Sequence, residues 1–328
     1  MIPEREATPE SVYLNRRQFL KAAGIRTLSA AALLSGCGHE RVFEPFEDTG
    51  DTGTNGGGSV TPPPQPPRPL YPATVNPEFN TLDRPLTEEE AAATYNNFYE
   101  FTTTKEVHKF IDKFQWYPWA VQVAGEVEKP KTYDFDDLVG RMPLEERLYR
   151  HRCVEAWSMA VPWTGFPMKA LIDEVKPLST ARFVKMTTFL RPDQAPGQFS
   201  NPQWPWPYVE GLTMAEATNE LTLLGTGIYG QPFPAQHGPP VRLVVPWKYG
   251  FKCIKSIVMI EFTREQPATF WNTLVPSEYG FFANVDPQTP RPRWSQATER
   301  VLGSNERVPT LSYNGYEKYV AQLYQSTG

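Results

Sequence analysis

The chain has 328 residues, a formal net charge of −5, 40% hydrophobic residues and only three cysteines. Lysine and arginine are dispersed among acidic residues and form no basic cluster, which argues against a nucleic-acid-binding protein. No apolar run in the sequence is long enough to form a membrane-spanning helix.

The N-terminus predicts export. Arg16 and Arg17 stand ahead of Phe19, and a run of small and apolar residues follows over residues 22–36. A charged segment before a short apolar one is typical of a signal peptide, and the arginine pair resembles the twin-arginine type. Because that route carries folded proteins, we expect a periplasmic protein that receives a cofactor before export.

Two segments precede the expected folded domain. Residues 1–37 form the expected signal peptide, and its end, residues 33–37, resembles the lipobox of bacterial lipoproteins, which makes Cys37 a candidate lipid anchor. Residues 38–79 are rich in glycine and proline and poor in apolar side chains. We therefore predict a flexible linker that would hold the folded part away from a membrane.

Residues 80–328 are expected to form a single catalytic domain. Runs rich in β-branched residues or alternating in polarity predict strands over residues 119–127, 183–189, 241–247 and 256–263. Two Thr-x-x-Glu capping boxes, at Thr87 and Thr213, predict helices over residues 88–95 and 214–220. Strands and helices do not alternate regularly, so the pattern favours an α+β fold with mostly antiparallel or mixed sheets and short helices.

Several common catalytic motifs are excluded. Residues 225–230 spell Gly-x-Gly-x-x-Gly, but Pro232 and Pro234 follow at once, where a dinucleotide site needs the start of a helix. The four histidines form no i, i+4 pair and there is no Cys-x-x-Cys, so zinc is unsupported. No Gly-x-Ser-x-Gly motif indicates a serine hydrolase.

Cys153 is the most informative residue. It ends a strand-like stretch in a chain that is expected to enter an oxidising compartment, so it is either half of a disulfide, with Cys253 as its partner, or a metal ligand. Arg152 and His151 flank it, and their positive charge would favour the thiolate. A thiolate is a soft ligand, suited to a metal held mainly by a group other than protein.

Four motifs carry a resemblance to a known family. They are Tyr-Asn-Asn-Phe-Tyr-Glu-Phe at 95–101, Arg-Cys-Val-Glu-Ala-Trp-Ser-Met at 152–159, Val-Pro-Trp-Lys-Tyr-Gly-Phe-Lys at 245–252 and Pro-Arg-Trp-Ser-Gln-Ala-Thr-Glu at 292–299. Together they resemble the catalytic subunits of periplasmic protein-methionine-sulfoxide reductases (MsrP-type), in the sulfite oxidase superfamily. The resemblance extends from about residue 80 to the C-terminus.

The resemblance implies a sulfite-oxidase-type fold that binds molybdenum through one molybdopterin, with Cys153 as the single protein ligand to the metal. It implies that Glu155 and Asn97 lie near the metal as catalytic residues. Arginine, lysine and loop amides are the groups that hold phosphate in proteins. The residues implied to contact the pterin or its phosphate are Asn96, Tyr99, Glu100, Thr188, His237, Arg242, Cys253, Ile254 and Lys255.

The resemblance also implies a function and partners. It implies oxygen-atom transfer that reduces methionine sulfoxide in oxidised periplasmic proteins and so repairs them, because that oxidation makes an apolar side chain polar. The sequence has no haem or iron–sulfur motif, so electrons must come from outside, and the resemblance implies a haem-containing membrane subunit that oxidises quinol. We expect a monomer or a heterodimer with that subunit.

Two alternatives stay open from the sequence. A sulfite dehydrogenase would share the superfamily and the thiolate-held molybdenum. A non-enzymatic lipoprotein, with Cys153 and Cys253 joined in a disulfide, would instead use a stapled domain to bind a partner.

Overall fold

The computed structural model describes residues 70–289, 292 and 294–325. The predicted signal peptide, the lipobox cysteine Cys37 and most of the predicted linker lie outside these residues. The described part of the predicted linker, residues 70–79, contacts the folded domain: β1 (Thr74–Val75) pairs with β4, and the Tyr71 hydroxyl donates to Thr226 Oγ1 at 2.7 Å. None of the described helices is long and apolar enough to cross a bilayer.

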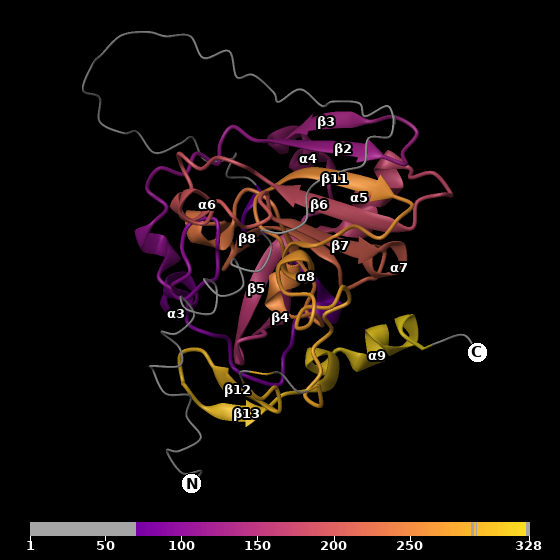
Figure 1. Ribbon diagram of the computed structural model, residues 1–328. Coiled ribbons are helices and arrows are strands. Elements are labelled where there is room, and N and C mark those ends of the chain that lie inside the picture. The colour runs from indigo at the N-terminus through magenta and orange to yellow at the C-terminus, as the bar shows by residue number, and fades with distance from the viewer. Residues whose placement is uncertain (1–69, 290–291, 293, 326–328) are drawn as a thin grey trace, which may run out of the picture. The chain divides into compact units, whose positions relative to one another are not determined.

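Two sheets organise the described residues (Figure 1). The first has eight strands and includes β4 (Glu145–Cys153), β5 (Trp157–Pro167), β8 (Leu223–Ile228), β9 (Gln231–Pro232), β10 (Arg242–Val244), β12 (Thr298–Val301) and β13 (Arg307–Pro309). The second has five, in the order β3 (Lys131–Asp134), β2 (Ala120–Gly125), β11 (Ile257–Thr263), β6 (Phe183–Thr188) and β7 (Val209–Thr213).

Pairing within the sheets is mixed. β1 with β4, β2 with β11 and β5 with β12 are parallel, whereas the other named pairs are antiparallel. This confirms the predicted α+β class with mixed sheets. The predicted strands correspond to β2, β6, β10 and β11, although β10 is limited to three residues.

The helices are short. The α-helices are α3 (Glu89–Thr94), α4 (Phe135–Arg141), α5 (Met168–Val175), α6 (Pro196–Ser200), α7 (Met214–Ala217), α8 (Phe270–Leu274) and α9 (Glu317–Val320). The 3-10 helices are η3 (Pro77–Phe79), η4 (Val107–Lys109), η5 (Ala235–His237), η6 (Gly250–Lys252), η7 (Ser312–Gly315) and η8 (Ala321–Leu323).

The two predicted capping boxes have different outcomes. At α7 the Thr213 hydroxyl accepts from the backbone N–H of Glu216, and the Glu216 carboxylate accepts from that of Thr213, so this prediction is confirmed. At α3 the prediction is wrong: the helix is preceded by Glu88 and has no side-chain cap. The Thr87 hydroxyl instead accepts from the backbone N–H of Ala160 in β5, because a tertiary contact takes the place of the local one.

The glycine-rich motif at residues 225–230 is not followed by a helix. Gly225 and Gly227 lie inside β8, and a turn at Tyr229 and Gly230 leads into β9. The absence of a helix here agrees with the exclusion of a dinucleotide site. A Cβ atom at Gly225 would press against the rings and methyl groups of Phe233 and Val244, so close packing accounts for this glycine.

The core of the first sheet centres on β5. Ten consecutive residues of this strand are buried, because it pairs with β4, β8 and β12 and is covered on both faces. Trp163 and Phe166 are completely buried. Burial of each such side chain contributes roughly 1.5–3 kcal/mol to stability. The turn between β4 and β5, which follows Cys153, is thereby attached to a strand that is buried along most of its length.

Candidate active site

A cleft of about 760 Å³, including its solvent-open mouth, brings together segments that are distant in the sequence. Residues 96–100, the β4–β5 turn, the segment around η5 and β10, and residues 250–255 all contribute to its wall. Every predicted site residue except Thr188 lines this cleft: Asn96, Asn97, Tyr99, Glu100, Cys153, Glu155, His237, Arg242, Cys253, Ile254 and Lys255.

Cys153 is placed at the cleft by a tight turn. It is the last residue of β4 and pairs with Trp157, the first residue of β5, and the Ala156 N–H donates to the Cys153 carbonyl at 3.0 Å. Ala156 closes the turn with φ at 62°, a left-handed conformation that costs energy for a residue with a Cβ. The Cys153 side chain is 4% exposed, and both Cys153 and Cys253 are free thiols. The disulfide that the sequence left open is therefore not formed.

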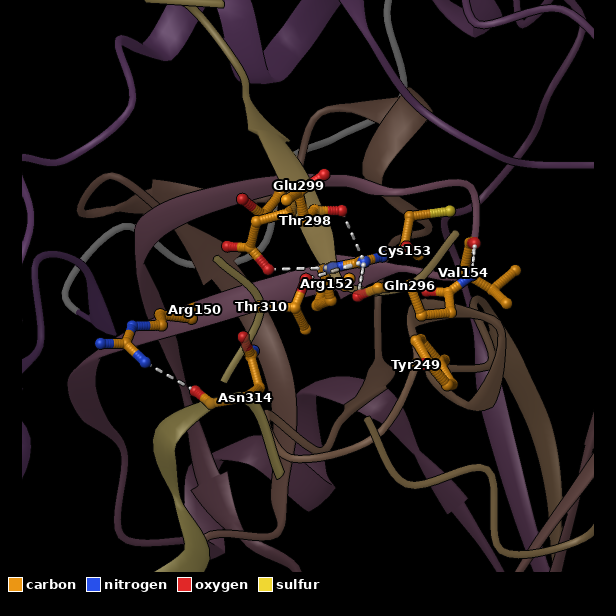
Figure 2. Close-up of polar contacts among 12 residues, drawn as sticks. Arg150, Arg152, Cys153, Val154, Tyr249, Gln296, Thr298, Glu299, Thr310 and Asn314 are labelled. Atoms are coloured by element: carbon orange, nitrogen blue, oxygen red, sulfur yellow. Dashed lines mark hydrogen bonds and ion pairs between the residues drawn. The ribbon is translucent and has the colours of Figure 1, made fainter. Parts of the chain in front are cut away.

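The C-terminal part of the chain supports this turn from behind. The side-chain amide of Gln296 donates to the Val154 carbonyl at 2.7 Å, and the Trp294 indole N–H donates to the same oxygen. Figure 2 shows Gln296 lying against Val154, next to the Cys153 sulfur. The sequence motif at residues 292–299 thus supports the motif at residues 152–159.

Arg152 lies beneath the turn and is completely buried. Its guanidinium pairs with the Glu299 carboxylate at 2.9 Å and donates to Thr310 Oγ1 at 3.1 Å and to the Cys153 carbonyl (Figure 2). The positive charge is therefore compensated by Glu299 on β12. Arg152 thus donates to the backbone of Cys153 and helps to hold it in place.

The structure corrects the expectation that Arg152 and His151 favour a thiolate in the cofactor-free chain. The pKa of the Cys153 thiol is raised to about 12, mainly by burial and then by the charge of Glu155. Burial and the charge of Arg242 lower the pKa of His151 well below its usual value, so this imidazole is neutral. A bound metal would deprotonate the thiol, since coordination replaces the proton.

Polar side chains surround the Cys153 sulfur. The Asn97 amide nitrogen donates to Sγ at 3.3 Å and to Glu155 Oε2 at 3.4 Å. The Tyr99 hydroxyl donates to Glu155 Oε1 at 3.3 Å. The structure thus brings the predicted catalytic pair, Asn97 and Glu155, together at the predicted metal ligand.

Lys105 is a member of this group that the sequence did not indicate. Its ammonium contacts Asn97 Oδ1 and forms an ion pair with Glu155 Oε2, and only 7% of its side chain is exposed. No local pattern marks it, because it reaches the site only when the loop of residues 96–105 closes on itself.

Cationic and imidazole side chains form another part of the wall. Arg242 is 2% exposed and His237 is 1% exposed, and Arg242 donates to the His237 carbonyl at 2.9 Å. Burial lowers the pKa of Arg242 to about 10. Burial, together with repulsion from Arg242, lowers the pKa of Lys255 to about 7 and that of His237 to about 3. Gly238, with φ at 86°, lets the backbone pass directly against the Lys255 side chain, because a Cβ there would overlap it.

The remaining predicted contacts are supported to different degrees. Glu100 is buried beside Lys255, and burial raises its pKa to about 7. Cys253 and Ile254 follow η6 and face the cleft. Thr188 donates to the Lys255 carbonyl at 2.7 Å and to the Ser256 carbonyl at 3.0 Å, so it supports the Lys255 loop. A direct contact between Thr188 and the cofactor stays a prediction.

The sequence also missed an aromatic wall of the cleft. Besides the predicted Tyr99 it includes Trp271, Tyr279 and Phe251, which come from separate segments. Successive ring centroids from Tyr99 to Trp271, to Tyr279 and to Phe251 lie 5.1 Å apart at each step. Aromatic residues usually belong to the hydrophobic core, so the sequence alone does not indicate that these four line a cleft.

The cleft residues fit an anionic cofactor that makes many hydrogen bonds. Asn96 Oδ1, His237 Nδ1 and Arg242 Nε are buried without a hydrogen-bond partner among the described residues. Such unpaired groups are costly, and the phosphate and the pterin heteroatoms of a bound cofactor would supply partners for them. Among the described residues no three His, Cys, Asp or Glu side chains lie together as a metal site.

Comparison with known proteins names this cofactor. The family model described as "oxidoreductase molybdopterin binding domain" matches residues 108–271, half of the chain. Among solved structures, the chain is similar to the sulfane dehydrogenase SoxCD from Paracoccus pantotrophus, at 16% identity and a TM-score of 0.39. That match covers 46% of this chain and 40% of the other chain.

The family match and the fit of the cleft agree on a molybdopterin-bound molybdenum cofactor. Residues 96–100 lie ahead of the matched range, yet they complete the cleft wall around Cys153. The chain therefore belongs to the oxidoreductase molybdopterin-binding domain family, as a molybdenum-dependent oxidoreductase.

Proposed function

We propose that this oxidoreductase reduces methionine sulfoxide in oxidised periplasmic proteins. The observation that carries the proposal is the aromatic wall beside Cys153 and Glu155, formed by Tyr99, Trp271 and Tyr279. Sulfur in an uncharged side chain contacts aromatic rings favourably. The four motifs that resemble protein-methionine-sulfoxide reductases support the same substrate.

In this proposal the cationic side chains of the cleft bind the cofactor and not the substrate. Arg242 and Lys255 would hold the phosphate of the cofactor, because arginine and lysine are the usual partners of phosphate. The aromatic wall carries no cation of its own, and a small dianion such as sulfite would gain little from it. An uncharged thioether or sulfoxide fits this surface better.

The net reaction consumes two electrons and two protons: the sulfoxide becomes a thioether and its oxygen leaves as water. Bound molybdenum supplies the oxygen-atom and electron transfer. The chain supplies orientation and protons. The Tyr99 hydroxyl donates to Glu155 Oε1, and the Glu155 N–H donates to Cys153 Sγ at 3.4 Å, so we assign proton delivery in the cleft to Glu155 and Tyr99.

The proposal includes location and partners. Export by the twin-arginine route, a lipid on Cys37 and a spacer over residues 38–69 would hold the enzyme near a haem-containing membrane subunit that donates electrons. Tethering would raise the local concentration of each partner for the other. The enzyme would act as a monomer or as a heterodimer with this subunit, on oxidised proteins of the envelope.

Steady-state assays on the molybdenum-loaded enzyme test the substrate. We expect turnover of methionine sulfoxide, free and within an oxidised protein, with a reduced dye as electron donor. Trp271→Ala should raise the KM for the sulfoxide at least about tenfold, because an apolar contact is lost. Phe110→Ala, at an exposed ring outside the cleft, is the matched control. Turnover of sulfite alone would refute the proposal and favour a sulfite dehydrogenase.

A further inference from the structure

Lys105 has a fixed position at the base of the loop that carries the site residues. The Asn96 N–H donates to the Lys105 carbonyl at 2.9 Å, which closes residues 96–105 into a loop. Phe98 and Phe101 pack inside this loop with ring centroids 4.8 Å apart, and both are almost completely buried. The Lys105 ammonium therefore starts from a rigid backbone and is directed into the site.

The contacts of Lys105 determine how the Asn97 side chain is oriented. An ammonium can only donate, so the atom of Asn97 that it contacts must be the amide oxygen, Oδ1. The amide nitrogen then faces the other way, toward Cys153 Sγ at 3.3 Å. The same ammonium forms an ion pair with the Glu155 carboxylate, which is 8% exposed. The pair compensates part of the cost of burying this negative charge beside the sulfur.

We propose that Lys105 is a positioning residue for the metal ligand: it orients the Asn97 amide so that it donates a hydrogen bond to the sulfur of Cys153. A hydrogen bond to a ligand sulfur withdraws electron density from it, and this stabilises the reduced metal and raises its midpoint potential. Lys105 thus sets the potential at which the bound molybdenum accepts electrons. The inference rests on the thiolate ligand and holds for any substrate of the site.

The experiment compares Lys105→Met, Lys105→Arg, Asn97→Ala and the double variant Lys105→Met/Asn97→Ala, each loaded with molybdenum. The readouts are metal content, midpoint potential by redox titration, the electron paramagnetic resonance spectrum of pentavalent molybdenum, and kcat with KM. Lys109→Met is the matched control, because Lys109 lies four residues further on, is 55% exposed and pairs with Glu106 away from the site.

We expect Lys105→Met to lower the midpoint potential, to alter the resonance spectrum and to reduce kcat by roughly 10–100-fold, as loss of an outer partner of a metal ligand does. KM should change far less. Lys105→Arg keeps a cationic donor and should lie closer to the wild type. In the double variant the shift in potential should be clearly smaller than the sum of the two single shifts, because part of the effect of Lys105 passes through the Asn97 amide.

Two results would overturn the inference. The first is a Lys105→Met enzyme with the wild-type potential and spectrum. The second is a double variant whose shift equals the sum of both single shifts, since Lys105 would then act by its charge alone. If Lys105→Met does not fold or load metal, Lys105→Arg serves as the test variant. A midpoint potential of Lys105→Arg as low as that of Asn97→Ala would then contradict the proposal.

Discussion

At the scale of single residues, the site buries two ionisable groups of opposite type, Lys255 and Glu100, next to each other. Burial and the charge of Arg242 lower the pKa of Lys255 from its ordinary 10.5 to about 7, and burial raises the pKa of Glu100 to about 7. The cofactor-free site therefore favours a neutral Lys255 near physiological pH. An anionic cofactor would restore the charge, because an opposite charge favours the ammonium.

The lowered pKa of Lys255 predicts a pH-dependent stability of the cofactor-free chain. Between about pH 7 and 10.5 the unfolded chain keeps the Lys255 proton and the folded chain does not. Stability rises with pH wherever the unfolded state binds more protons, so Lys255 makes the free energy of unfolding increase over this range. Lys255→Met should remove that part of the increase.

Urea denaturation at pH 7 and pH 9 measures this effect. The wild type should gain more stability over the interval than Lys255→Met does, and the exposed Lys109→Met should behave like the wild type. Equal gains in the wild type and in Lys255→Met would show that Lys255 keeps its ordinary pKa in the fold.

At the scale of elements, the β4–β5 turn depends on strands far along the chain. Arg152, at the end of β4, pairs with Glu299 on β12, and Glu299 also accepts from Arg84 at 2.8 Å. This one carboxylate, 1% exposed, therefore connects the N-terminal segment, the Cys153 hairpin and the C-terminal strands. The arrangement explains why the sequence motif around Glu299 accompanies the one around Cys153.

Glu299→Gln should destabilise the fold strongly. The substitution leaves the guanidinium of Arg152 buried without its partner charge, and breaking a buried ion pair in this way costs about 3–5 kcal/mol. Urea denaturation monitored by circular dichroism gives the change in the free energy of unfolding. Glu306→Gln, at an exposed position beyond β12, should change it by less than about 0.5 kcal/mol. A similar small change for Glu299→Gln would contradict the bracing role.

Element types followed from the sequence where local patterns decide them. β6 and β11 alternate or are rich in β-branched residues, and α7 carries a capping box that forms as predicted. The same capping pattern predicted helix α3, but Thr87 does not cap it, because its hydroxyl accepts from the Ala160 N–H in β5. Local propensity gives way where a tertiary contact competes for the same side chain.

At the scale of the whole molecule, the long motifs predicted most of the cleft. Asn96, Glu155 and Arg242 were assigned from resemblance, and the fold brings them to one cavity. Lys105 and the aromatic wall could not be found this way. Their roles depend on which distant segments come together in the fold. No sequence pattern around a single lysine or around separate aromatic residues indicates these contacts.

The central claim is that Cys153 binds the molybdenum of an oxidoreductase, and metal content together with activity tests it most directly. Protein that has been exported natively should contain one molybdenum per chain, as should the control Lys109→Met, at an exposed residue outside the cleft. Cys153→Ala should lose molybdenum-dependent turnover by at least about 100-fold, because it removes the thiolate that would hold the metal. A Cys153→Ala enzyme with full molybdenum-dependent activity would contradict the account.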